Sequence, residues 1–150
     1  MRDPTGLALH VQTGTLALTA LPTSPFLARR YTRSFLDSCQ GIDPDTAETA
    51  ELIVSELVTN AVRYAGEPAG VTQHPQRAAA SPISLSLRNF REVLLIEVYD
   101  TDSNPPILTS ADGDAESGRG LMLVSTLSKE WSYSFHPSGG KIVYCFLEKA

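Results

Sequence analysis

The sequence predicts an α+β fold, a two-layer sandwich in which helices cover one face of a mostly antiparallel sheet. Two patterns lead to this prediction. Residues 43–65 contain no internal Gly or Pro and repeat apolar residues at helical spacing, whereas residues 83–88 and 131–135 alternate between apolar and polar residues, as half-buried strands do. The strands come in pairs separated by short turns, which favours antiparallel hairpins.

The N-terminal part begins with a segment, 1–14, that we expect to be peripheral. A strand is predicted over 15–21, with an apolar pattern that could extend back to Leu7, and Pro22 ends it. Ser24 and Pro25 then form a helix start, in which the serine hydroxyl accepts an unpaired amide and proline takes the first helical position. This helix is expected to run to residue 40, where Gly41 stops it.

The helix predicted over 43–65 begins with a second start signal, Asp43-Pro44, and carries an apolar stripe of Ala50, Ile53, Leu57, Ala61 and Ala65. Residues 66–82 are rich in Gly, Pro and Ala and are expected to form a flexible connector.

The C-terminal half is expected to contain four strands and one helix. Strands at 83–88 and 93–99 would form a hairpin that turns near 89–92. A long loop, 101–117, would follow, then a helix from Gly120 to Lys129. Strands at 131–135 and 141–147 would close the sheet around a turn at Gly139-Gly140.

The composition limits the classes of function. The chain has 150 residues, 42% of them hydrophobic and 19% charged, which fits one domain that spans 1–150. A net charge of −5 and a pI near 5.1 would repel a nucleic acid, so direct nucleic-acid binding is not expected. Arg29, Arg30 and Arg33 are interpreted as the solvated face of a helix. No signal peptide or membrane span is legible, so a cytoplasmic location is expected.

The residues suited to metals and disulfides are few and scattered. Cys39 and Cys145 occur in a helix end and a strand, where buried thiols are a better interpretation than a disulfide or zinc site. The three histidines, His10, His74 and His136, do not have the spacing of metal ligands.

Two polar side chains on the long helix are candidates for phosphate chemistry. Glu56 and Asn60 are four residues apart, so both lie on one side of the helix, at the border of its apolar stripe. Their oxygens suit magnesium, and a carboxylate beside a bound phosphate can take a proton from an attacking hydroxyl. The same pair also occurs on ordinary solvated helix surfaces.

Two further features lie downstream. Asp100 ends an apolar strand, where a carboxylate could accept a hydrogen bond from an exocyclic amine, although Asp is also a common turn residue. The sequence Ser-Gly-Arg-Gly-Leu at 117–121 would open a helix, and amides there could converge on an anion. Neither a Walker sequence nor the dinucleotide-binding glycine pattern is present.

The order of these motifs resembles the GHKL ATPase and kinase superfamily. The resemblance rests on Glu-Leu-Val-Thr-Asn-Ala-Val-Arg-Tyr-Ala at 56–65, a strand that ends in Asp100, and the glycine motif at 117–121, and it covers about residues 20–148. Within the superfamily the chain looks most like the bacterial anti-sigma-factor serine kinases.

This resemblance implies roles for the candidate residues. It makes ATP and Mg²⁺ the expected ligands, with Asn60 binding the Mg²⁺ that bridges the phosphates. Glu56 would be the general base for a serine or threonine hydroxyl, and Asp100 would receive the adenine amino group.

The glycine motif would hold the phosphates. The resemblance implies phosphate contacts by Gly118, Gly120 and the amide of Leu121, with Arg119 as an extra contact. Residues 101–117 would form a lid over the nucleotide. Two departures from the family pattern affect this region: Thr101-Asp102-Ser103-Asn104-Pro105-Pro106 stands where many members place glycines, and Tyr64 stands where a histidine is common.

The expected function is a serine/threonine protein kinase that transfers the γ-phosphate of ATP to an antagonist protein, of the anti-anti-sigma type, and that could sequester a sigma factor. Family membership also implies that a homodimer could form. Three alternatives remain open: an inactive ATP-dependent regulator that binds a partner, the detached catalytic part of a histidine kinase, and a structural domain without a ligand.

Overall fold

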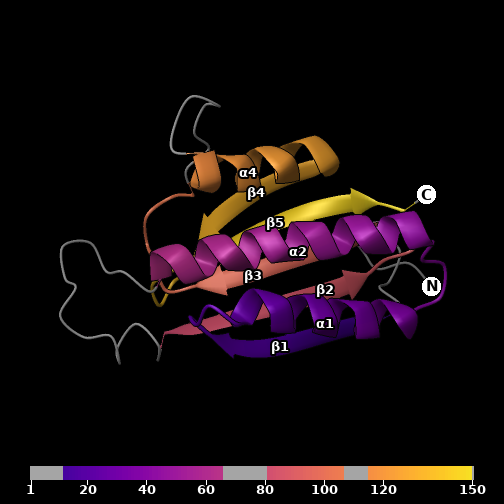
Figure 1. Cartoon of the computed structure of the whole chain (residues 1–150), viewed down its shortest axis with the longest axis horizontal. Coiled ribbons are helices and arrows are strands. Elements are labelled where there is room, and N and C mark those ends of the chain that lie inside the picture. The colour runs from indigo at the N-terminus through magenta and orange to yellow at the C-terminus, as the bar shows by residue number, and fades with distance from the viewer. Residues whose placement is uncertain (1–11, 66–80, 107–114, 150) are drawn as a thin grey trace.

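The computed structural model describes residues 12–65, 81–106 and 115–149. Its elements, in chain order, are β1 (Gln12–Thr19), α1 (Ser24–Asp37), α2 (Pro44–Ala65), β2 (Pro82–Asn89), β3 (Val93–Asp100), α4 (Ala115–Leu127), β4 (Glu130–Phe135) and β5 (Lys141–Glu148). The strands form one layer and the helices lie over one of its faces, which confirms the predicted α+β sandwich (Figure 1). Among the described helices, none has both the length and the apolar character needed to cross a membrane.

The sheet has five strands in the order β1-β2-β3-β5-β4, and each neighbouring pair is antiparallel. The two predicted hairpins, β2–β3 and β4–β5, are both present. Pairing of β3 with β5 joins them and places Asp100 directly opposite Lys141. Because opposite residues of an antiparallel pair project from the same face, the register sends both of these side chains toward the helices.

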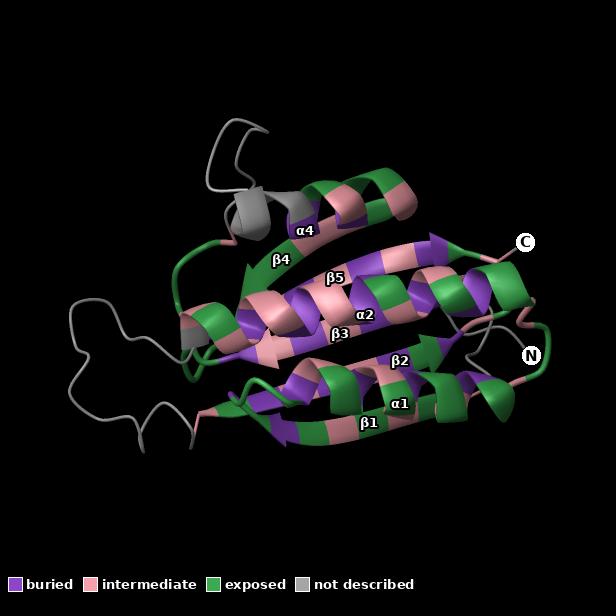
Figure 2. Cartoon of the chain, viewed as in Figure 1, coloured by how far each residue is buried: buried purple, intermediate pink, exposed green. Residues whose placement is uncertain are grey.

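The core lies between the sheet and α2. Alternate strand residues such as Leu85, Ile96 and Cys145 are fully buried, and the α2 stripe predicted from the sequence is buried at Ala50, Ile53, Leu57 and Ala61. Figure 2 shows buried positions concentrated on α2, β3 and β5, with more exposed positions on α1 and β4. The long helix is therefore anchored over the middle of the sheet, which fixes the positions of its polar side chains.

The first strand differs from its predicted bounds. β1 begins at Gln12 and pairs with β2 along its whole length, so residues 12–14 are not peripheral. In the sequence, Gly14 interrupts the apolar alternation, so the start of the strand is not recognisable there. In the structure, Gly14 packs against α1, and a Cβ at this position would lie 2.7 Å from the Phe35 ring. Pro82, predicted to end the connector, opens β2 opposite Thr19. The rest of the connector, 66–80, lies outside the described residues.

The start of α1 also corrects a prediction. Ser24 does not accept an amide at the helix start, because it is already the first helical residue and Thr23 stands before it. Its buried hydroxyl donates a hydrogen bond to the carbonyl oxygen of Thr19 instead. The helix ends at Asp37, three residues before the predicted end, and Gly41 follows with a φ of 79°.

The prediction that α4 begins at Gly120 was wrong, because the helix already begins at Ala115. Glycines weaken a helix only modestly, and packing can outweigh propensity. That packing comes from Leu121 and Val124, which are buried against the core, and α4 lies beside α2.

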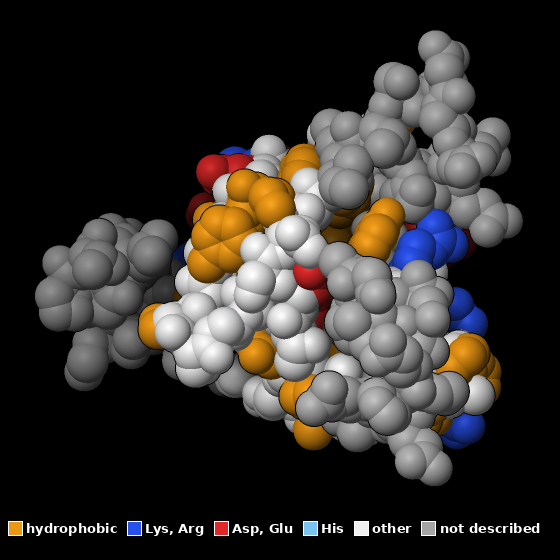
Figure 3. All heavy atoms as spheres, turned by 90° about the vertical axis from the view of Figure 1, so that its left-hand side faces the viewer, with side chains coloured by type: hydrophobic (Ala, Val, Ile, Leu, Met, Phe, Trp, Pro, Cys, Tyr) orange, Lys and Arg blue, Asp and Glu red, His pale blue; other side chains and the backbone are white. Residues whose placement is uncertain are grey.

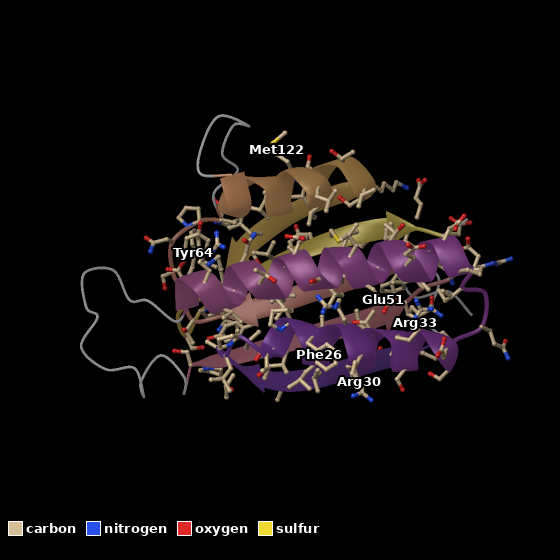
Figure 4. The ribbon with its side chains drawn as sticks, viewed as in Figure 1. Phe26, Arg30, Arg33, Glu51, Tyr64 and Met122 are labelled. Carbon is tan, nitrogen blue, oxygen red and sulfur yellow. The ribbon has the colours of Figure 1, made fainter. Side chains whose placement is uncertain are left out.

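The arginine cluster of α1 is only partly a solvated face. Arg30 is exposed, but Arg29 is half-buried and donates a hydrogen bond of 2.8 Å to Ser55 Oγ of α2. Arg33 forms an ion pair with Glu51, so these arginines link the two helices (Figure 4).

The two cysteines are free thiols, as predicted. Cys145 is buried, and burial raises the pKa of its thiol to about 12, whereas Cys39 is only half-buried. His136, the one histidine among the described residues, is exposed and contacts Tyr99 edge-on.

Candidate functional site

A cavity of about 360 Å³ opens at the end of the molecule where α2 and β3 end and β5 begins. Its size is that of a small-molecule site. Its walls come from α2, α4, β3, β5 and the segment after β3, through Leu57, Asn60, Ala61, Tyr64, Val98, Asp100, Asp102, Asn104, Pro105, Pro106, Leu121, Lys141 and Val143. Figure 3 views this end and shows acidic side-chain atoms near the middle of the face, between hydrophobic ones.

Glu56 and Asn60 of α2 lie close to Gly120 of α4, and Asn60 also lines the cavity; these three residues are here called the helix end. A Cβ built on Gly120 would lie 2.8 Å from Glu56 Oε2 and 3.6 Å from Asn60 Nδ2. The glycine therefore lets α4 approach the two polar side chains without displacing the Glu56 carboxylate, which a larger residue would push aside. The sequence predicted that the polar pair and the glycine motif converge, and the structure brings them together.

The rest of the glycine motif lies in α4, in a different way from that predicted. In a helix that begins at Ala115, the amides without helical partners belong to its first turn, up to Ser117. Gly118, Gly120 and Leu121 follow that turn, so their amides could meet a phosphate only if the start of the helix unwound. Leu121 instead contributes a buried side chain to the cavity wall.

Arg119 and the other residues of 115–119 belong to α4, but their side chains lie outside the described residues. The predicted phosphate contact of Arg119 stays a prediction. The proposed lid, 101–117, includes residues 107–114, which are also outside the described residues; its last three residues, 115–117, are helical.

Asp100, Asp102 and Lys141 also line the cavity, and these three residues are here called the strand end. Asp100 and Lys141 are only 2% and 3% exposed, and Lys141 Nζ lies 3.0 Å from Asp100 Oδ1. The same Nζ lies 3.3 Å from Asp102 Oδ2 and 3.2 Å from the Asp102 carbonyl oxygen. The Asp102 amide donates a further hydrogen bond of 2.8 Å to Asp100 Oδ1.

Opposing effects act on the Asp100 carboxyl group. Removal from water disfavours its charged form and raises its pKa above the ordinary value, and the repulsion of Asp102 adds slightly to this. The positive charge and hydrogen bond of Lys141 oppose the rise, as does the Asp102 amide. The net direction is upward, so burial outweighs the cation.

The turn between β4 and β5 locks the strand end in place. Gly140 has a φ of 82°, and a Cβ there would fall on the carbonyl oxygen of Asp100. Its amide donates a hydrogen bond of 3.1 Å to Ser103 Oγ. The neighbouring Gly139 carbonyl accepts a hydrogen bond from Tyr99 at 3.2 Å. These contacts hold the segment after Asp100 against the start of β5.

The segment after β3 forms a folded turn at the place where many members of the family that the sequence resembles have glycines. Asp102 Oδ1 accepts hydrogen bonds from the Asn104 amide and side chain, at 3.1 and 2.8 Å. Pro105 and Pro106 continue this segment along the cavity, which is also lined by Tyr64, near the end of α2 (Figure 4). The second departure, Tyr64, is thus a cavity residue.

Sequence reasoning missed Lys141. The sequence pattern placed this lysine only at the start of the last predicted strand, without a partner or a role. A usable signal was nonetheless present, because Lys141 has the same strand parity as Val143, Cys145 and Leu147, which are all buried. A lysine on the buried parity of a strand needs a carboxylate partner, and the register makes that partner Asp100.

The helix end suits a magnesium ion held mainly by phosphates. Among the described residues there is no group of three or more His, Cys, Asp or Glu side chains that could hold a metal on its own. Magnesium bound with a nucleotide does not need such a group, because it takes one or two protein oxygens and completes its shell with phosphates and water. The amide of Asn60 beside Glu56 fits that requirement.

Comparison with curated proteins found no match. Residues 18–146, which include every element from the end of β1 to β5, match the histidine kinase-like ATPase domain family. The matched range contains every residue that lines the cavity, Asn60 and Asp100 among them. The chain therefore belongs to the family of histidine kinase-like ATPase domains.

Proposed function

We propose that the protein is an ATP-binding regulatory serine/threonine kinase of the anti-sigma-factor type. The observation that supports this proposal is the approach of Gly120 to Glu56 and Asn60, together with the cavity that Asn60 and Asp100 both line. Family membership supports ATP as the nucleotide. Glu56 favours a kinase over a protein that only binds ATP, because nucleotide binding alone does not require a carboxylate beside the phosphates.

In this proposal the strand end binds the base and the helix end binds the phosphates with magnesium. At the strand end, Asp100 accepts a hydrogen bond from the amino group of adenine, while Val98, Val143 and Leu57 supply apolar surface for the ring. At the helix end, Asn60 holds the magnesium ion, which neutralises phosphate charge when it is bound.

The transfer step assigns one proton to Glu56. The hydroxyl oxygen of a serine or threonine attacks the γ-phosphorus, the bond from that phosphorus to the bridging oxygen of ADP breaks, and Glu56 takes the hydroxyl proton. Positioning supplies most of the rate in such reactions, so the close approach of α4 to Glu56 is central to the proposal.

The proposed substrate is a small antagonist protein of the anti-anti-sigma type, and the proposed second partner is a sigma factor held in the ATP-bound state. The resemblance to anti-sigma-factor kinases supports both. Direct contact with nucleic acid is not proposed, because the chain carries a net charge of −5. A homodimer is proposed on the resemblance alone.

The test is transfer of labelled γ-phosphate to candidate antagonist proteins, combined with calorimetric measurement of ATP binding. Glu56→Gln is expected to bind ATP with nearly wild-type affinity and to transfer phosphate at least about 100-fold more slowly. Glu48→Gln, an exposed position on the same helix, is the matched control and should transfer normally.

Equal transfer by Glu56→Gln would remove this residue from the role of base. A wild-type protein that binds ATP and a partner but transfers no phosphate would support the alternative function, an ATP-dependent regulator that acts by binding. Absence of ATP binding would overturn both.

A further inference from the structure

Lys141 has the chemistry of a phosphate ligand, but its donors are already used. An ammonium group has three N–H donors. Three acceptors lie within hydrogen-bond distance of Lys141 Nζ: Asp100 Oδ1 at 3.0 Å, the Asp102 carbonyl oxygen at 3.2 Å and Asp102 Oδ2 at 3.3 Å. No donor is left for a ligand, and two carboxyl groups face one cation, so this end of the cavity does not attract an anion.

The strand end therefore presents an acceptor to a ligand. Asp100 uses Oδ1 for both of its hydrogen bonds, from Lys141 and from the Asp102 amide. Within residues 12–65, 81–106 and 115–149, no donor is bonded to Asp100 Oδ2. A ligand group that donates a hydrogen bond fits here, whereas one that only accepts would meet an oxygen and gain nothing.

The arrangement is rigid because three separate features hold it. The β3–β5 register places Asp100 and Lys141 opposite each other. Gly140 brings the start of β5 onto the Asp100 backbone, and Asn104 holds the other oxygen of Asp102. A cluster whose members cannot turn away from one another keeps the same donor and acceptor pattern when a ligand enters.

We infer that Lys141 determines which nucleotide base the cavity accepts, by committing its donors to Asp100 and Asp102 so that only an acceptor faces the base. A purine with an amino group at position 6 is selected over one with a carbonyl oxygen there. This inference rests on the proposed function, because it assumes that the cavity binds a nucleotide with the base at the strand end.

The test compares ATP with inosine triphosphate, which has a carbonyl oxygen in place of the 6-amino group. Affinities of the full chain for both, with magnesium, are measured by calorimetry. The wild type is expected to bind ATP at least about tenfold more tightly, because the carbonyl of inosine leaves Asp100 Oδ2 unpaired.

Two variants change the donor pattern in different ways. In Asp102→Ala, the side chain no longer accepts a hydrogen bond from Lys141, so one Lys141 donor becomes free to bind the inosine carbonyl. We expect ATP affinity to change by less than about threefold and the preference for ATP to fall by about fivefold or more. Asp102 is a turn residue with a side chain 14% exposed, so this variant should fold.

Lys141→Met removes the cation, and the buried Asp100 carboxyl group then takes up a proton more readily. A protonated carboxyl group can donate to a carbonyl or accept from an amine, so the preference for ATP should fall to within about threefold of equal affinity. Lys129→Met is the matched control: its ion pair with Glu148 is exposed and lies at the opposite end of β5 from Lys141, so the preference should not change.

A role that is only structural would weaken both nucleotides by the same factor and leave their ratio unchanged. An unchanged ratio in Asp102→Ala would therefore overturn the inference, even if Lys141→Met failed to fold. Equal affinity of the wild type for the two nucleotides would overturn it as well and leave the proposed kinase function standing. Failure of the wild type to bind either nucleotide would instead remove the proposed function and the inference together.

Discussion

The strand end and the helix end differ in how deeply their polar side chains are buried and how fully these side chains pair with one another. At the strand end, Asp100, Asp102 and Lys141 satisfy one another in a buried cluster fixed by strand register. At the helix end, Glu56 and Asn60 are only half-buried and lie close to Gly120, where α4 approaches α2. The first end contributes to the fold before any ligand binds, whereas the second keeps its polar groups available for one.

This difference has consequences for stability and activity. Buried charges are costly unless they are paired, so loss of one member at the strand end leaves an unsatisfied group. The half-buried side chains at the helix end can be altered with little cost to folding. Variants at the strand end should thus lower stability, and variants at the helix end should lower activity alone.

The largest expected effect is on the buried ion pair. Lys141→Met should lower the free energy of unfolding by about 3–5 kcal/mol, because two carboxyl groups lose their cation in a site removed from water. The exposed Lys129–Glu148 pair provides the control, and Lys129→Met should cost less than about 1 kcal/mol. Chemical denaturation measures both, and similar losses would contradict the distinction between the ends.

The β4–β5 turn provides a second comparison. Gly139 and Gly140 both have positive φ, 101° and 82°, but a Cβ on Gly139 meets nothing within 4 Å, whereas one on Gly140 falls on the Asp100 backbone. Gly139→Ala should cost about 1–2 kcal/mol, and Gly140→Ala about 3 kcal/mol or more. Equal costs, measured by denaturation, would show that the start of β5 and the Asp100 backbone can move apart to accommodate the methyl group.

Gly120→Ala tests the helix end. The new methyl group would displace the Glu56 carboxylate, and misplacement of a catalytic group should lower phosphate transfer by roughly 10- to 100-fold. Stability should stay within about 1 kcal/mol of wild type, because alanine is the better helix former and Glu56 can turn aside.

Ser125→Ala, an exposed change on the same helix, is the control and should leave transfer and stability unchanged. Normal transfer by Gly120→Ala would mean that the approach of α4 to Glu56 does not matter for catalysis.

The smallest expected effect is a pH dependence. Burial raises the pKa of Asp100 above its ordinary value of 3.8, so over the pH range from 3.8 to the raised pKa the folded state binds more protons than the unfolded state. The contribution of Asp100 to stability is therefore complete below pH 3.8 and is lost as the pH rises through the raised pKa. Relative to Asp100→Asn, the wild type should become less stable with rising pH.

Denaturation of both proteins across this range measures the effect. A relative gain in wild-type stability with rising pH would instead mean that the attraction of Lys141 exceeds the cost of burial.

Much of the fold was predictable because it depends on local patterns. The apolar stripe of 43–65 and the alternation in the strands produced the correct helix, the two hairpins and the layer on which the helices lie. The errors lie where packing outweighs propensity. Gly118 and Gly120 look like a helix start in sequence, yet α4 begins earlier because its apolar side chains pack against the core.

The candidate site was likewise predictable only where local spacing was sufficient. Glu56 and Asn60 were found because helical spacing alone places them on one side of α2. The partner of Asp100 was not found, because Lys141 is far away in sequence and only the pairing of β3 with β5 brings the two together.

The sequence by itself determined the elements and the residues able to do chemistry, since hydrophobic periodicity and side-chain type act over short stretches of chain. Only the tertiary structure decided that one pair of charges is buried and neutralised at the strand end, and that a glycine lets two helices meet at the other. Strand register and helix approach are set by the packing of the whole core, and no local pattern contains that information.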